Sequence, residues 1–263
     1  MKGLSDLAGM TRIDDVIEAM NEIVQWAKDN NSRLGYFAAL YLGVTERIKE
    51  GVLRGEFEDN ERMEKMDVIF AKRYLEAFYQ YQAGKKASEC WEAAFRPAEE
   101  HGLIVLQHLL LGMNAHITFD LGVAAAEAAP GDLLPSFKND FDKINDVLAS
   151  LVDKVDSEMG RITPIFRWVD AFLGNANERF TGFSMTIART QAWKKAERLA
   201  FEEGESKQKV LEVFDEESAR QAKLVSDPPG RITKLILAII GLTEKSSIKG
   251  IIEILRDDDL KKA

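Results

Sequence analysis

The spacing of apolar residues along the chain predicts helices from end to end. Between Ile13 and Ala27 apolar side chains recur every three or four residues, the period of an α-helix with one buried face. Thr11 and Asp14 are placed to form a capping box at its start, and a polar run at 29–32 ends it. The same period predicts further helices over residues 37–48, 62–81, 91–95, 103–129, 141–155, 165–173, 180–201, 210–226, 232–242 and 248–255. The sequence has no convincing strand alternation, so the expected fold is an all-α, multi-helix bundle around a buried central helix.

One domain is expected for the whole chain. Its 263 residues, of which 46% are hydrophobic, are enough for a single large core of stacked helices. The Pro228-Pro229-Gly230 turn is the only candidate linker, and the helical tail after it, residues 231–263, is too short for a second domain.

The central stretch from Leu103 to Ala126 is long and apolar enough to be compared with a membrane span, which needs roughly 20 apolar residues. It also carries six polar side chains: Gln107, His108, Asn114, His116, Thr118 and Asp120. These groups would be costly in lipid, whereas partners in a protein core can satisfy them. We therefore expect a buried core helix and no transmembrane segment.

The sharpest chemical feature of this helix is the pair His116 and Asp120. At about 100° and 1.5 Å per residue, the two side chains share one helix face, one turn apart. Asp120 is expected to accept from one ring nitrogen and so to leave the other free for acid-base work. Asn114 points roughly 160° away from His116, so it is expected to bond a different neighbouring helix.

A metal site built from the three histidines does not fit one helix. His108 and His116 are separated by eight residues, or about 12 Å of rise, whereas zinc ligands lie about 2 Å from the metal. His101 precedes His108 and is therefore still further from His116. A metal would need carboxylates from other helices beside His116 and Asp120, and no cofactor is expected.

A second candidate group is Asp67, which falls inside the apolar face of its helix, near Met63 and Tyr74. A carboxylate there must be paired, protonated or functional. Its natural partners are His116, His108 or an arginine such as Arg189, with Tyr74 as a further hydrogen-bonding group. An Asp-His-Asp cluster in an aromatic-lined pocket is the expected result.

Charge and cysteine content narrow the class of protein. With 35 Lys and Arg against 44 Asp and Glu, the net charge is -9 and no basic stripe is present, which argues against nucleic acid as a partner. Cys90 is the only cysteine, and residues 1–10 lack the apolar run of a signal peptide. A cytoplasmic location is therefore expected, and a homo-oligomer stays open.

Four stretches carry a resemblance that covers most of the chain: Tyr41–Glu46, Asp67–Tyr74, Gly112–Leu121 and Ala188–Trp193. Their specific part is Gly-Met-Asn-Ala-His-Ile at 112–117, followed by Asp120 and Leu121. Together they resemble an uncharacterised, mainly bacterial family of all-α proteins of unknown function. Members carry Asn and another polar residue where this chain has Thr118 and Phe119, a departure that weighs against a metal. The resemblance implies the fold and the choice of residues, and it leaves the reaction open.

A looser similarity is to zinc-dependent phospholipase C and the related single-strand nucleases, all-α enzymes with a His-x-x-x-Asp pair on a helix. His116 and Asp120 match that spacing. The further histidines that such trinuclear sites need are missing from this chain.

The leading hypothesis is an enzyme that performs metal-independent acid-base chemistry on a mostly apolar small molecule bound between helices. An isomerase, cyclase, lyase or hydrolase would fit. The expected catalytic residues are His116, Asp120 and Asp67, and the expected substrate-binding residues are Tyr74, His108, Asn114 and Arg189. The alternatives are a non-catalytic protein that binds an apolar ligand, and a metal-dependent hydrolase that uses His116 and Asp120.

Overall fold

The computed structural model describes residues 1–100, 102–163, 184–244 and 247–256, and in this part of the chain it is helical without a β-strand. The α-helices are α1 (Ile13–Asp29), α2 (Gly35–Leu53), α3 (Asn60–Gln82), α4 (Glu89–Glu99), α5 (Val105–Met113), α6 (Leu121–Ala128), α7 (Lys138–Ile162), α10 (Met185–Leu199), α11 (Gly204–Ser226), α12 (Arg231–Thr243) and α13 (Ile248–Leu255). Short 3₁₀ helices occupy Leu4–Gly9 and Gly131–Phe137, and a π-helical segment, Asn114–Asp120, joins α5 to α6. The predicted all-α fold is confirmed.

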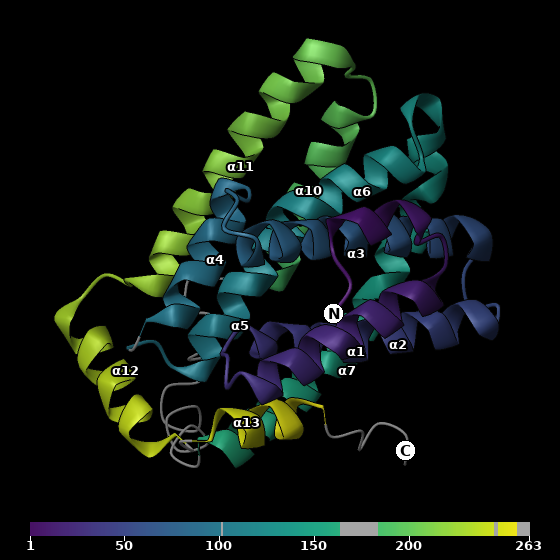
Figure 1. Ribbon diagram of the computed structural model, residues 1–263. Helices are drawn as coiled ribbons and strands as arrows, with labels where there is room; N and C mark the ends of the chain where they lie inside the picture. Colours follow the sequence, from purple (N-terminus) through teal and green to yellow (C-terminus); the bar gives the residue numbers. More distant parts are fainter. Residues whose placement is uncertain (101, 164–183, 245–246, 257–263) are drawn as a thin grey trace.

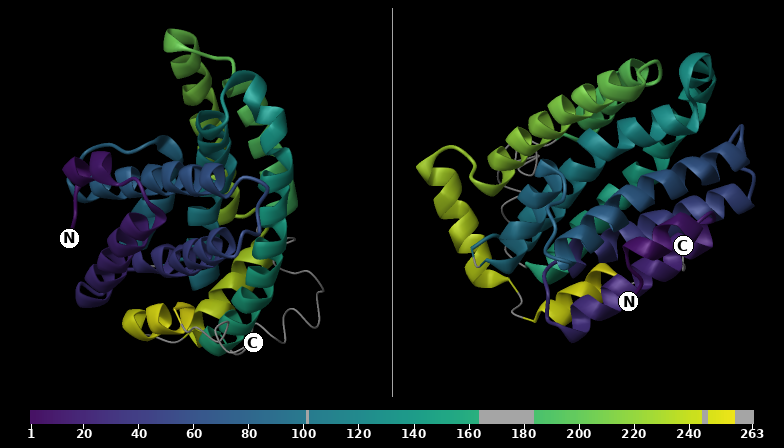
Figure 2. Two further views of the ribbon diagram at one scale, coloured as in Figure 1. Left: turned by 90° about the vertical axis from the view of Figure 1, so that its right-hand side faces the viewer. Right: turned by 45° about the horizontal axis from the view of Figure 1, so that its top comes forward.

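The continuous rod formed by α5, the π-helical segment and α6 lies in the middle of the molecule (Figure 1). It packs against α2, α3 and α4 and also against α10 and α11, and α4 packs in turn against α11. The two further views show α10 and α11 beside α6, away from the layer that α1 and α2 form (Figure 2). Polar side chains of the rod bond several of these helices, since Asp120 bonds residues of α3 and α4 and Asn114 bonds a residue of α11.

The middle of the rod departs from α-helical geometry. The amide of Leu121 donates to the carbonyl of His116, an i to i−5 bond in place of the α-helical i to i−4 bond. Such π-helical insertions are rare and occur frequently at functional sites. All seven residues of the segment are buried. The apolar pattern alone predicted one uninterrupted α-helix here, because that pattern does not report a one-residue change in hydrogen bonding.

Gly122, at the start of α6, lets the rod approach α10 closely. A Cβ atom at this position would lie 2.6 Å from the backbone oxygen of Ala192, inside the normal contact distance. Glycine is therefore required here by the contact between the two helices.

Several predicted boundaries shift by a few residues. At the start of α1 the Asp15 carboxylate accepts from the amides of both Thr11 and Arg12, so the cap uses Asp15, and the predicted Thr11 and Asp14 capping box is wrong. Pro97 lies inside the last turn of α4 instead of beyond it. The helix predicted over 165–173 and His101 lie outside the described residues.

The rod is also the one candidate membrane span among the described residues. Val105–Ala128 is long and apolar enough to cross a membrane, but 94% of its most apolar window is buried inside the protein. That burial matches the expectation of a core helix.

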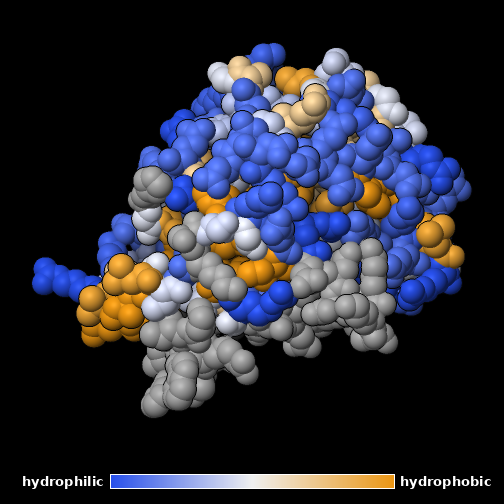
Figure 3. Space-filling view, turned by 60° about the horizontal axis from the view of Figure 1, so that its bottom comes forward, coloured by the Kyte–Doolittle hydropathy of each residue, from blue (hydrophilic) through white to orange (hydrophobic). Residues whose placement is uncertain are grey.

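The C-terminal tail has an apolar helix that covers little of the core. In α12, Ile240 is buried, whereas Ile232, Leu235, Ile239 and Leu242 are exposed. Figure 3 shows hydrophobic surface gathered at the edge of the molecule where α12 lies.

Candidate functional site

Asp120 is at the centre of a buried polar cluster inside the rod. Its Oδ1 accepts from Nε of Arg73 at 2.8 Å, and its Oδ2 accepts from the indole Nε1 of Trp91 at 2.9 Å. Nδ1 of His116 lies 3.3 Å from the same Oδ2. Only 1% of the Asp120 surface is exposed, so the carboxylate depends on these partners for its solvation.

Burial favours the neutral form of the His116 imidazole, and one of its ring nitrogens has no hydrogen-bond partner. Burial lowers the pKa of His116, the Asp120 carboxylate opposes this effect, and the Arg73 cation adds to it. A neutral ring that donates from Nδ1 to Asp120 keeps its lone pair on Nε2. Nε2 is buried and has no hydrogen-bond partner. The arrangement therefore presents a base whose orientation is fixed by a carboxylate.

Aromatic rings enclose this imidazole. Phe70 stacks on it with ring centroids 3.6 Å apart and an interplanar angle of 8°. Tyr41 meets it edge to face at 4.3 Å, and Phe37 does so at 5.7 Å. Trp91 and Tyr74 complete the ring of contacts. A cationic ring would lose its hydration here, which explains the lowered pKa of His116.

Asp67 lies on α3, one turn before Phe70, and is 3% exposed. Its Oδ2 has no hydrogen-bond partner. Burial, with a smaller effect from Glu64, raises the pKa of Asp67 to about 7. The pKa of Tyr41 is raised by burial and then by the charge of Asp67, so Tyr41 links this carboxyl group to the His116 ring.

Of the predicted binding residues, Tyr74 lies at the cluster and His108 lies beside it. The buried hydroxyl of Tyr74 has no partner, and its ring contacts Phe37, Trp91 and His116. His108 instead packs edge to face on Tyr36, and burial lowers its pKa to about 4.

A cavity of about 20 Å³ adjoins His108, and Phe37, Trp91 and Gly112 line it. Phe37 and Trp91 also contact the His116 ring, so this cavity and the cluster share two walls. Its volume is about that needed for one water molecule.

Asn114 and Arg189 bond residues outside the cluster, and their role in substrate binding stays a prediction. The Asn114 amide donates to the Ser218 carbonyl of α11 at 2.8 Å, as its angle on the helix indicated. Arg189, on α10, donates to the carbonyl of Phe141 and lies over that ring at 4.5 Å. It faces α7 and is therefore no partner of Asp67.

The charges around Asp120 also bear on the metal hypothesis. Both of its oxygens accept from nitrogen donors, so a metal would have to displace the Arg73 or Trp91 contact. Among the described residues, no three His, Cys, Asp or Glu side chains gather in a way that could hold a metal ion.

The residues that other helices place against Asp120 and His116 could not be predicted from the sequence. Arg73 lies within the stretch that carried the family resemblance, yet its pairing with Asp120 joins residues 47 apart and leaves no periodic signal. Trp91 lies on the apolar face of a short helix together with Phe95, and nothing in its neighbourhood indicates that its indole N–H faces a carboxylate. Tyr41 and Phe70 lie on apolar helix faces, where aromatic residues are ordinary core.

Comparison with known families identifies one family for this chain. A family model described as "Family of unknown function (DUF5995)" matches residues 13–228. The chain belongs to this family. The DUF5995 match includes α1 to α11, and with them the whole cluster, and it ends before α12. No curated protein and no solved structure matches the chain. Membership in a family of unknown function is thus confirmed, while the role of the Gly112–Leu121 motif stays a prediction.

Proposed function

We propose that this protein is an acid-base catalyst for a small, mostly apolar molecule held between its helices, with His116 as the proton acceptor. The observation that supports this most is the hydrogen bonding of the two ring nitrogens of His116. Nε2 of His116 is buried without a partner while Asp120 orients Nδ1. A base fixed by a carboxylate and left with one free nitrogen is the arrangement that general base catalysis needs.

Asp67 is the proposed proton donor. With a pKa of about 7 it is partly protonated at neutral pH, whereas His116 is kept neutral by a lowered pKa. Two groups whose environments shift their pKa values in opposite directions are suited to opposite roles in one proton transfer. Isomerase, cyclase, lyase and hydrolase reactions all fit this pair, and none of them requires a cofactor in this proposal.

An apolar substrate is proposed because the walls around the imidazole are aromatic. The imidazole of His116 is surrounded by the rings of Phe37, Tyr41 and Phe70, which offer few polar contacts to a ligand. The neighbouring cavity holds about 20 Å³, so entry of a substrate needs the rings of Phe37 or Trp91 to swing aside.

A second candidate is a non-catalytic protein that binds an apolar ligand, with the polar cluster serving only to hold the helices in register. It is favoured by one observation, the complete burial of His116 and Asp120. The two candidates differ in whether Nε2 of His116 can take a proton from a bound molecule. A metal-dependent hydrolase is less well supported, since both oxygens of Asp120 are engaged.

The test uses nitrobenzisoxazole, an apolar probe for general bases. A base removes its ring C–H proton, the N–O bond breaks, and a coloured cyanonitrophenolate is released. We expect the purified protein to accelerate this reaction and His116→Gln to lose about 100-fold of the rate. Asp120→Asn should lose about tenfold, because the ring is no longer held in the required tautomer.

The matched control is Thr118→Ala, which lies in the same π-helical segment but bonds the Asn114 carbonyl, away from His116. Urea unfolding shows which variants remain folded. Loss of rate in His116→Gln with the Thr118→Ala rate retained supports the catalyst. Folded His116→Gln that keeps the wild-type rate, or a wild type without acceleration, favours the non-catalytic binding protein.

A further inference from the structure

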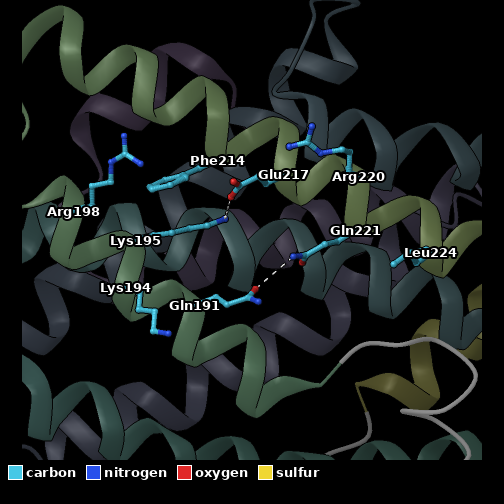
Figure 4. A pocket seen from close by; sticks show the side chains of 9 residues that line it. All are labelled: Gln191, Lys194, Lys195, Arg198, Phe214, Glu217, Arg220, Gln221 and Leu224. Carbon is cyan, nitrogen blue, oxygen red and sulfur yellow. Dashed lines mark hydrogen bonds and ion pairs between the residues drawn. The ribbon is translucent and has the colours of Figure 1, made fainter.

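An open groove of about 610 Å³ runs between α10 and α11. Its lining residues are Gln191, Lys194, Lys195, Arg198, Phe214, Glu217, Arg220, Gln221 and Leu224. Figure 4 shows Lys195 crossing the groove from α10 toward Glu217 of α11. This volume is typical of sites for small molecules.

The groove is cationic in a chain whose net charge is -9. Four of its lining side chains are Lys or Arg and one, Glu217, is a carboxylate. Among the described residues, Lys194, Arg198 and Arg220 have no carboxylate within ion-pair distance, and Glu217 lies 3.9 Å from Lys195. Guanidinium groups without a carboxylate partner attract anions with two acceptor oxygens, and Figure 4 shows Arg198 and Arg220 toward opposite ends of the groove.

The wall of the groove has an apolar ring at its centre. Phe214 is buried, and its ring lies 4.9 Å from Nζ of Lys195 and 5.7 Å from the guanidinium carbon of Arg198. Two cations thus lie near one aromatic ring. A flat apolar group can pack on this wall while its charged end meets the arginines.

Lys195 connects the groove to the rod. Its Nζ donates to the Thr118 carbonyl in the π-helical segment at 2.7 Å, and it lies 3.4 Å from Oγ of Ser218. The residue is 8% exposed, and burial lowers its pKa. A buried cation held in this way gives the floor of the groove a fixed positive charge that does not depend on a mobile surface side chain.

We propose that the groove between α10 and α11 binds a small organic dianion, a phosphate monoester or a dicarboxylate, with a flat apolar part against Phe214. Arg198 and Arg220 bind the anionic oxygens, Lys195 supplies positive charge from below, and the Gln191 and Gln221 amides offer neutral hydrogen bonds. None of the residues that line this groove belongs to the acid-base cluster.

Calorimetric titration of the full chain tests the site with phenyl phosphate, phthalate and neutral benzyl alcohol as probes. We expect a dianion to bind at millimolar concentration or tighter and the alcohol not to bind. Arg198→Gln and Arg220→Gln should each weaken binding by about tenfold, through the loss of a charge-assisted hydrogen bond. Glu217→Gln should tighten it by about threefold, because a carboxylate that lines the groove is removed.

The control is Lys209→Gln on the same helix, where an exposed lysine pairs with Glu205 at 2.8 Å outside the groove. It should bind as the wild type does. A preference for phenyl phosphate over phthalate identifies a phosphate ligand, the reverse identifies a dicarboxylate, and either supports the site. Absence of dianion binding, equal binding of the alcohol, or unchanged affinity in both arginine variants would overturn it.

Discussion

Nε of Arg73 lies 2.8 Å from Oδ1 of Asp120, a contact between α3 and the π-helical segment that neutralises a carboxylate with 1% of its surface exposed. The Arg73 side chain itself is 24% exposed, so one end of this ion pair reaches solvent. The same cation lowers the pKa of His116. Arg73 therefore affects both the stability of the cluster and the protonation of its base.

Removal of this cation gives the first prediction. Arg73→Gln should lower the free energy of unfolding by about 3 kcal/mol, because Asp120 keeps a buried charge without its counterion. It should also raise the pKa of His116. Urea unfolding and NMR titration measure the two effects. Arg54→Gln, which breaks an exposed pair with Glu50, should change stability by less than about 0.5 kcal/mol. Equal small effects of both variants would show that the Arg73 contact is dispensable.

Asp67 gives a prediction about pH. Its pKa is raised from 3.8 to about 7, so the folded state holds this proton longer than the unfolded chain does. The contribution of Asp67 to the free energy of unfolding is present in full below pH 4 and is lost as the pH rises to 7. The total loss is up to roughly 4 kcal/mol.

The comparison with Asp67→Asn isolates this contribution from other titrating groups. The difference in unfolding free energy between the wild type and Asp67→Asn should move in favour of the variant between pH 4 and 7 and stay constant above 8. A difference that does not depend on pH would mean that Asp67 titrates normally in the folded protein.

Gly112 gives a steric prediction at the wall between the small cavity and the cluster. A Cβ atom there would lie 2.4 Å from the Phe37 ring, which also contacts His116. Gly112→Ala should therefore cost about 1–3 kcal/mol of stability and displace Phe37. Gly9→Ala, where no atom lies within 4 Å of the new Cβ, should be neutral or slightly stabilising. Thermal unfolding measures the stability of both variants. Equal stability of Gly112→Ala and Gly9→Ala would contradict the packing described for Phe37.

Much of the fold follows from apolar periodicity, because burial of one helix face imposes that period on the sequence. The placement of Asp67 inside the apolar face of α3 is confirmed by its 3% exposure. The shared face of His116 and Asp120 and the opposite direction of Asn114 also follow from helix geometry.

What periodicity does not encode is which helix packs against which. The Arg73 and Trp91 contacts to Asp120 depend on the positions of α3 and α4 around the rod. The groove between α10 and α11 depends on both helices packing against the rod with few contacts to each other. Lys195 is an example of a buried residue that periodicity does not predict. A lysine in a helix is usually on the surface, whereas this one is buried against the Thr118 carbonyl.

The central claim is that His116 is a neutral base with its proton on Nδ1 and a free Nε2. Nitrogen-15 NMR of labelled histidine, with His116→Gln to assign the signal, measures this state directly. We expect at pH 7 a neutral His116 ring, protonated on Nδ1 alone, with a pKa below 6.5. A proton on Nε2, or a doubly protonated ring at pH 7, would contradict the account.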